Sequence, residues 1–179
     1  LLDLHVISED FYVDLLNLIY GWKLRNANSL QQNAPGIDLV DDSNRILAQV
    51  TGTSTKGKID HSLKEIPEKY TGYHFYFVPI VIDAKEQRKY KYNPPHEVVF
   101  NPKTDILDIH FIANKIKGMQ DIADIDTIAM FIKNNIQNDV PDTTQLTSGL
   151  NYIISQLAED DLNECDFDMT EFEIEAKIS

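Results

Sequence analysis

The stretch PGIDLVDDSNRILAQVTGTSTKGKI (residues 35–59) decides the fold, because it reads as turn, strand, turn, strand, loop and helix start. A Pro-Gly turn opens the first strand, DDSN forms the second turn, and RILAQVT (45–51) forms the second strand. The two strands predict a β-hairpin. Side chains alternate along an extended strand, so we expect Gln49 and Thr51 on one face, with Asp38 near Gln49.

Helical patterns lie on both sides of this hairpin. SEDFYVDLLNLIYGW (8–22) has apolar residues at helical spacing, with Ser8 as the predicted N-cap. KIDHSLKEIPEKY (58–70) predicts a second helix. YHFYFVPIVID (73–83) is too apolar for an exposed strand and predicts a central strand, with Pro79 at a bulge or an edge position.

The rest of the chain is predicted to be mainly helical. Three segments carry apolar residues three and four positions apart, namely 105–119, 124–136 and 144–161. The C-terminal DMTEFEIEAKIS alternates like a strand. The element order predicts an α/β core in residues 1–104, with a mixed central sheet between helices. Residues 105–179 form a helical, acidic extension that packs on this core or contacts a partner.

The charge of the chain is unevenly distributed. The 179 residues have a net charge of −13. Residues 119–179 hold 14 Asp/Glu and two Lys, a net of −12, which leaves −1 for residues 1–118. This excess argues against non-specific binding of duplex DNA by the whole chain, and acidic helices suit a protein partner.

One segment of the core is basic. The stretch from Lys85 to Lys103 contains five Lys or Arg side chains, against Glu86 and Glu97. It is a candidate DNA-phosphate surface, formed by Lys85, Arg88, Lys89 and Lys91. The alternative is a solvated loop without a ligand.

The sequence also indicates the cellular compartment of the protein. No apolar run reaches the roughly 20 residues of a membrane span, and LLDLHVISEDFY lacks the features of a signal peptide. The lone Cys165 excludes an intramolecular disulfide framework, which fits a reducing compartment, so we expect a cytoplasmic protein. The five His residues share no zinc-ligand spacing.

The loop after RILAQVT permits a first functional hypothesis, nucleotide binding. Gly52-x4-Gly57-Lys58 resembles a P-loop between a strand and a helix, and Asp83 ends the next apolar strand. Ile59 stands where a hydroxyl must hold Mg²⁺, however, and its branched apolar side chain cannot bind a metal. The sequence therefore favours a different site.

The hairpin itself supports a second hypothesis, a divalent-metal site. Asp38 offers a carboxylate, and Gln49 offers a second oxygen ligand on the same face. A nearby Lys would stabilise charge on a phosphate. This set is typical of phosphodiesterase sites built on two strands, in which water attacks the phosphate.

These residues resemble the PD-(D/E)xK nuclease superfamily, with its restriction-endonuclease-like fold, and within it the Mrr-type branch whose strand reads Q-x-K. The first helix is similar as well, because Glu9 precedes Leu15-Leu16 and then Gly21-Trp22. The block LLNLIYGWKLRNAN…PGIDLVD…AQVT…TKGKI looks still closer to the SMEK-type domain of prokaryotic conflict proteins. The resemblance covers roughly residues 5–85.

The resemblance implies a Mg²⁺- or Mn²⁺-dependent nuclease that hydrolyses DNA in a bacterial defence setting. Asp38 and Gln49 match the metal ligands, and Glu9 matches a helix carboxylate that assists, with Asp10 and Asp14 as alternatives. Thr51 stands where the Mrr-type pattern has Lys. Lys58 or Lys56, at the start of the next helix, would then supply the missing positive charge.

The same residues also permit other interpretations. Asp38 could cap a turn, Gln49 could be a satisfied half-buried amide, and Glu9 could simply favour the helix dipole. Thr51 and the acidic C-terminal part are also compatible with a catalytically inactive nuclease fold. Such a module would join a multi-component, ABC ATPase-linked defence assembly through a protein partner.

Overall fold

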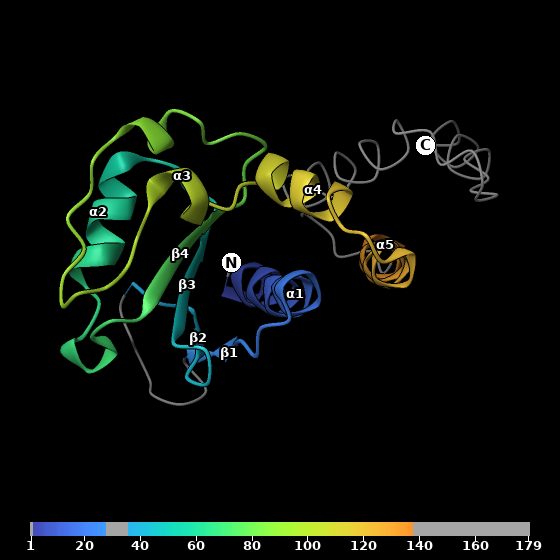
Figure 1. Cartoon of the computed structure of the whole chain (residues 1–179), viewed down its shortest axis with the longest axis horizontal. Coiled ribbons are helices and arrows are strands. Elements are labelled where there is room, and N and C mark those ends of the chain that lie inside the picture. The colour runs from blue at the N-terminus through green and yellow to red at the C-terminus, as the bar shows by residue number, and fades with distance from the viewer. Residues whose placement is uncertain (1, 28–35, 138–179) are drawn as a thin grey trace.

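The computed structural model describes the backbone of residues 2–27 and 36–137, with the side chains of residues 10–27 and 36–135. A mixed sheet lies between two helical layers (Figure 1). The longer elements are helices α1 (Leu2–Tyr20), α2 (Lys56–Lys64), α4 (Ile109–Lys117) and α5 (Ile122–Gln137), and strands β3 (Ile46–Thr51) and β4 (His74–Pro79). The shorter ones are β1 (Arg25–Asn26), β2 (Leu39–Asp41), η2 (Glu68–Tyr70), η3 (Gln87–Lys89) and α3 (Pro102–Asp105). The predicted α/β class is confirmed.

In the described residues the sheet has the order β1-β2-β3-β4. The predicted hairpin is present, because β2 and β3 are antiparallel, with Leu39 opposite Ala48 and Asp41 opposite Ile46. β3 then runs parallel to β4, with α2 as the crossover between them. Gln49 consequently lies between β2 on one side and Phe77 of β4 on the other.

The two faces of the sheet bury two separate hydrophobic clusters. Ala48 and Val50 belong to the cluster under α1, with Leu15. Leu47 belongs to the cluster under α2, with Ile59. Since side chains alternate along β3, Gln49 and Thr51 share the α2 face with Leu47.

β4 is the last strand of the sheet ladder, whereas a central strand was expected. Its outer edge is still covered, because Phe75 donates a backbone hydrogen bond to Val99 and Leu107 donates one to Phe77. This cover explains why the strand is so apolar. Pro79 is its final residue, where the missing N–H interrupts no ladder.

The structure differs from the local predictions at three elements. α1 begins at Leu2, so Ser8 lies inside the helix and is not its N-cap. β1 was not predicted, because two residues give no periodic signal. α2 begins earlier than residue 58, since Thr55 caps it by accepting a hydrogen bond from the Lys58 N–H, and it ends at Lys64. The early end agrees with the next proline, Pro67, because the residue before a proline avoids helical geometry.

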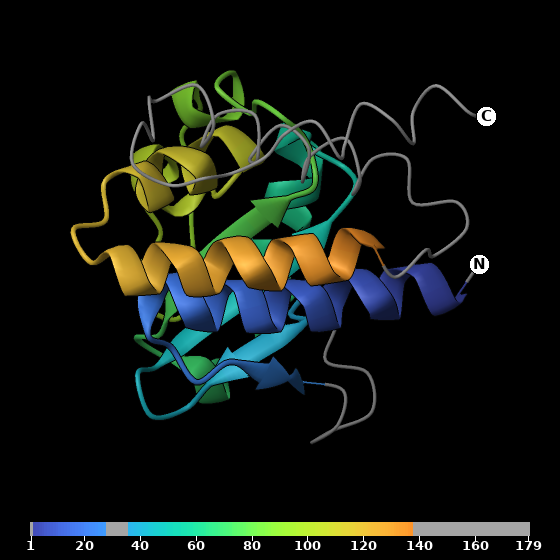
Figure 2. The same cartoon turned by 90° about the vertical axis from the view of Figure 1, so that its right-hand side faces the viewer.

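The described part of the acidic extension packs on the core. α5 lies along α1 (Figure 2), and the rings of Phe11 and Phe131 stack with centroids 5.3 Å apart. Ile112 and Ile116 of α4 are buried in the same cluster. Helices α4 and α5, the described helices of residues 105–179, therefore share one hydrophobic cluster with α1 and β3. The predicted helix at 144–161 and the C-terminal strand lie outside the described residues.

Candidate functional site

Asp38 and Gln49 meet at the open end of the β2–β3 hairpin. The Gln49 Nε2 donates a hydrogen bond to the Asp38 Oδ2, and the Val50 backbone N–H donates to the same oxygen at 2.8 Å. The backbone joins them too, because the Asp38 N–H donates to the Ala48 carbonyl at 3.0 Å. The predicted proximity of the two side chains is confirmed.

The orientation of the Gln49 amide limits what this pair does in the free protein. Its nitrogen, rather than its oxygen, faces Asp38, and its Nε2 also donates to the Val50 carbonyl at 3.1 Å. An amide carries a donor and an acceptor, so rotation about the last side-chain torsion would present Oε1 instead. Gln49 is 6% exposed, and this rotation must take place inside the site.

Thr51 stands where the Mrr-type pattern has lysine, and its side chain stabilises the loop that follows β3. Its Oγ1 accepts a hydrogen bond from the Thr53 N–H at 3.1 Å, and the side chain is buried. Lys56 forms an ion pair with Asp60, one helical turn further along α2. Lys58 lies in the first turn of α2 and forms no ion pair with any of the described residues. Lys58 is therefore the better candidate for a phosphate contact.

The geometry of this loop does not favour the P-loop hypothesis. A phosphate nest needs successive N–H groups in alternating right- and left-handed backbone conformations. Neither Gly52 nor Gly57 has a positive φ. The hydroxyls of Thr51 and Thr55 also accept hydrogen bonds from loop and helix N–H groups that a nest would direct at phosphate.

Glu9 lies on the described backbone of α1, but its side chain is outside the described set. The alternatives Asp10 and Asp14 are both exposed. In the described part of the chain, no three His, Cys, Asp or Glu side chains gather closely enough to hold a metal ion. Among the described side chains, Asp38 and Gln49 are therefore the candidate metal ligands at the hairpin.

The basic segment is largely neutralised by its own neighbours. Lys85 pairs with Asp83 at 3.4 Å, and Lys89 pairs with Glu86 at 2.7 Å. Arg88 forms the most buried ion pair of this segment, with Asp108. Among the predicted phosphate contacts, Lys91 is exposed and makes no ion pair with the described residues.

Arg88 holds a buried carboxylate, that of Asp108, which was not among the predicted site residues. Its guanidinium pairs with Asp108 at 2.7 Å and donates to the Ile106 carbonyl at 2.8 Å. Asp108 is fully buried and also accepts from the N–H groups of Ala84 and Phe111. Arg88 thereby fixes the segment after β4 against α4, and its guanidinium is engaged inside the protein where a contact with DNA phosphate was expected. The N-cap position before Ile109 was the available signal.

The comparison with family models confirms the resemblance to the SMEK-type domain. The family model of the SMEK domain matches residues 1–117. The chain belongs to the SMEK domain family. The matched part of this SMEK domain protein ends with the last residue of α4 and includes Asp38, Gln49 and Lys58. Comparisons with curated proteins and with solved structures found no match. No described helix is long and apolar enough to cross a membrane.

Proposed function

We propose that this SMEK domain protein is a Mg²⁺-dependent nuclease with a restriction-endonuclease-like core, which hydrolyses DNA phosphodiester bonds in bacterial defence. The single observation that carries the proposal is the contact between the Asp38 carboxylate and the Gln49 side chain at the end of two paired strands. The order α1, hairpin, α2 and parallel β4 supports it, because the resemblance implies the same core order.

The chemistry of the pair is compatible with a small divalent cation. Mg²⁺ is commonly held by one or two carboxylates, with water and substrate phosphate completing its octahedron. Asp38 would supply the carboxylate, and Gln49 would supply Oε1 after its amide rotates. When bound, the cation would stabilise the charge that develops on the scissile phosphate.

The remaining roles belong to residues near the hairpin. Lys58, in the first turn of α2, would contact the scissile phosphate and replace the positive charge that Thr51 lacks. Glu9 would assist from α1, with Lys56 as a weaker second cation because Asp60 holds it. Lys91 and Lys85 would steer the DNA backbone towards the site.

Calorimetric titration of Mn²⁺ tests the proposal without requiring a known substrate. The parent protein is expected to bind, and Asp38→Ala is expected to lose binding completely. Asp42→Ala is the matched control, because it removes an exposed carboxylate from the turn at the other end of the hairpin, where Asp42 pairs with Arg25. Binding that survives in Asp38→Ala, or no binding in the parent, would remove the basis for the nuclease.

A second candidate function is a catalytically inactive nuclease fold that joins an ABC ATPase-linked defence assembly through a protein partner. The observation in its favour is that Asp38 Oδ2 already accepts two hydrogen bonds, from Gln49 and Val50. The net charge of −12 in residues 119–179 also suits a protein partner better than DNA. This candidate predicts no Mn²⁺ binding by the parent and no cleavage of any DNA form.

A further inference from the structure

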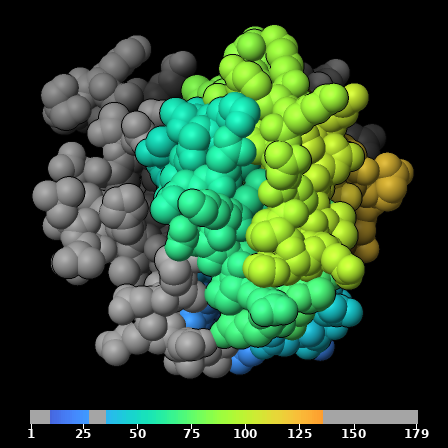
Figure 3. All heavy atoms as spheres, turned by 90° about the vertical axis from the view of Figure 1, so that its left-hand side faces the viewer, coloured from blue at the N-terminus to red at the C-terminus, as the bar shows by residue number. Residues whose placement is uncertain are grey.

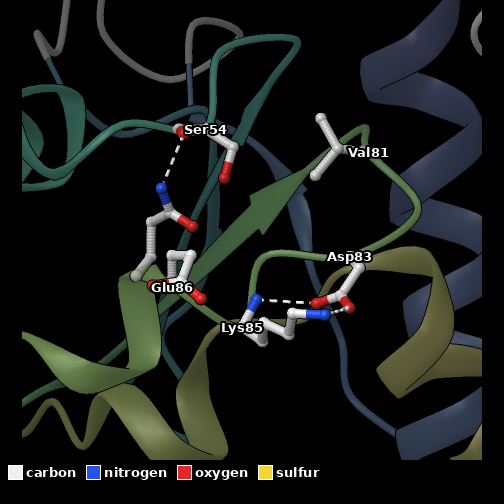
Figure 4. Close-up of a pocket in the computed structure, with 6 residues that line it drawn as sticks. Ser54, Val81, Asp83, Lys85 and Glu86 are labelled. Atoms are coloured by element: carbon white, nitrogen blue, oxygen red, sulfur yellow. Dashed lines mark hydrogen bonds and ion pairs between the residues drawn. The ribbon is translucent and has the colours of Figure 1, made fainter.

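A cavity of about 540 Å³ opens beyond the carboxyl ends of β3 and β4 (Figure 4). One wall is the loop between β3 and α2, and the other is the segment that follows β4. On the surface these two parts of the chain lie side by side (Figure 3). The lining residues are Ser54, Val81, Asp83, Lys85, Glu86 and Gln87.

The walls of this cavity are held in place by specific hydrogen bonds. The Gln87 Nε2 donates to the Ser54 carbonyl at 2.9 Å and so ties one wall to the other. The Val81 carbonyl accepts from the Ile109 N–H at 3.1 Å, which anchors the second wall to α4. Buried Asp108 holds the same wall at Ala84. A cavity with fixed walls requires little reorganisation to bind a ligand.

The polar groups of the lining define the ligand that would fit. Ser54 Oγ is one of three buried polar side-chain atoms in the described residues that have no hydrogen-bond partner, and it points into the cavity (Figure 4). A hydroxyl without a partner in the protein can donate or accept a hydrogen bond with a bound ligand. Asp83 accepts hydrogen bonds, Lys85 offers a cation that is 72% exposed, and Val81 offers an apolar contact.

The position of the cavity connects it with the hairpin site. Ser54 follows Thr51 by three residues, and the Ile80 N–H donates to the Thr51 carbonyl at 2.8 Å where β4 ends. Gln49 lies on the same strand, two residues before Thr51. Ligands of open α/β sheets bind outside the carboxyl ends of parallel strands, and β3 and β4 are the parallel pair here.

We propose that the cavity receives one unpaired nucleotide of the substrate strand, next to the phosphate that the hairpin site would hold. This inference rests on the proposed nuclease function. The Lys85 ammonium contacts the phosphate, Val81 contacts the sugar or base, and Ser54 and Asp83 bind polar groups of the base. A base inside a duplex cannot enter such a cavity unless it leaves the stack. The preferred substrate is therefore single-stranded or locally opened DNA.

Fluorescence anisotropy with a labelled single-stranded oligodeoxynucleotide tests the cavity, with its blunt duplex as the comparison. The buffer contains EDTA, so the result does not depend on the metal site and no cleavage occurs. Ser54→Ala is expected to weaken binding of the single strand about fivefold, the effect of one lost hydrogen bond. Ser62→Ala is the matched control, because Ser62 Oγ is equally buried and unpartnered but lies on α2 in the core. It should leave the affinity unchanged.

Lys85→Gln provides a second, independent measurement. For single strands, each lost phosphate contact reduces the slope of log K against log salt concentration by about 0.7. Lys64→Gln, at the exposed C-terminal end of α2, makes the same charge change away from the cavity and should leave the slope unchanged.

The possible outcomes separate this inference from the proposed function. If Ser54→Ala binds the strand like the parent, or if duplex binds as tightly as single strand, the cavity is not a nucleotide site, whatever Mn²⁺ does at Asp38. Absence of strand binding by the parent also overturns it. If Ser54→Ala weakens strand binding while the parent binds no Mn²⁺, the cavity is a strand-binding site on a protein that is not a metal nuclease.

Discussion

The two ends of the β2–β3 hairpin each contain an aspartate, and their environments differ. At the turn, Asp41 is 1% exposed and accepts hydrogen bonds from the Lys23 N–H, the Asn44 N–H and the Asn44 Nδ2, at 2.7 to 3.0 Å. At the open end, Asp38 is half-buried and accepts from Gln49 and Val50 through one oxygen.

The difference lies in the partners more than in the aspartates. Asp41 is almost fully buried, and the backbone N–H groups of Lys23 and Asn44 hold it together with the Asn44 side-chain amide, so its carboxylate has no open side for a metal. Asp38 faces a side-chain amide that can turn from donor to acceptor. We infer that the turn end stabilises the hairpin, whereas the open end keeps the capacity to bind a cation.

The largest expected effect on stability is at the turn. Asp41→Ala leaves buried donors of Lys23 and Asn44 without a partner, and should lower the free energy of unfolding by about 3 kcal/mol. Asp38→Ala should cost about 1 to 2 kcal/mol, since the Val50 N–H and the Gln49 Nε2 lose an acceptor at a half-buried position. Urea unfolding followed by circular dichroism measures both. Equal losses at the two positions would contradict the distinction between a stabilising end and a binding end.

Gln49→Glu is expected to change the free energy of unfolding by a smaller amount, and the sign of the change should differ without and with Mn²⁺. Without metal, a second carboxylate next to Asp38 should lower the free energy of unfolding by about 1 to 2 kcal/mol, because like charges lie close together. With Mn²⁺ the order should reverse, since the added carboxylate is a better ligand and bound metal stabilises the folded state. Thermal unfolding with and without Mn²⁺ measures this reversal. Gln49→Met, which adds no charge and removes the ligand oxygen, should show no gain with Mn²⁺.

The smallest expected effect is a pH dependence at the turn. Burial acts to raise the pKa of Asp41, but hydrogen bonds from Asn44 and Lys23 outweigh it and hold the pKa below its ordinary value of 3.8. The folded protein therefore binds fewer protons there than the unfolded chain. This contribution to stability is fully present above pH 3.8 and is lost as the pH falls through the folded pKa.

Unfolding measured at a series of acidic pH values in the parent and in Asp41→Asn tests the sign. The advantage of the parent should shrink as the pH falls below 3.8. An advantage that stays constant over this range would mean that the Asp41 charge does not stabilise the turn.

Local sequence was sufficient to predict the hairpin and the side chains that share its faces. The alternation of Leu47, Ala48, Gln49 and Val50 is a period-two signal, and a strand has only two faces. The proximity of Asp38 and Gln49 then followed from the length of the turn. The roles of these residues in catalysis stay predictions, because contact between two side chains does not establish which ligand they bind.

Other features depend on residues that are far apart in the chain. Arg88 looked like a phosphate contact because its neighbours are basic, but Asp108, 20 positions later, binds it in the core. The pairing of Lys56 with Asp60 is different, because it is a local contact between residues four positions apart on α2. No pattern around Ser54 indicates that its hydroxyl lacks a partner, since that depends on the segment after β4.

The sequence by itself determined the α/β class, the hairpin register and the pairing of Asp38 with Gln49, because these follow from periodicity and turn length over a few residues. The tertiary structure alone decided that Asp108 neutralises Arg88, which side chains line the cavity, and how far the core extends into α4 and α5. The physical reason is that hydrogen bonding, ion pairing and burial depend on distances in space. Between distant segments, these distances are set by the parallel crossover through α2 and by the contacts of buried Asp108 with Arg88 and Ala84.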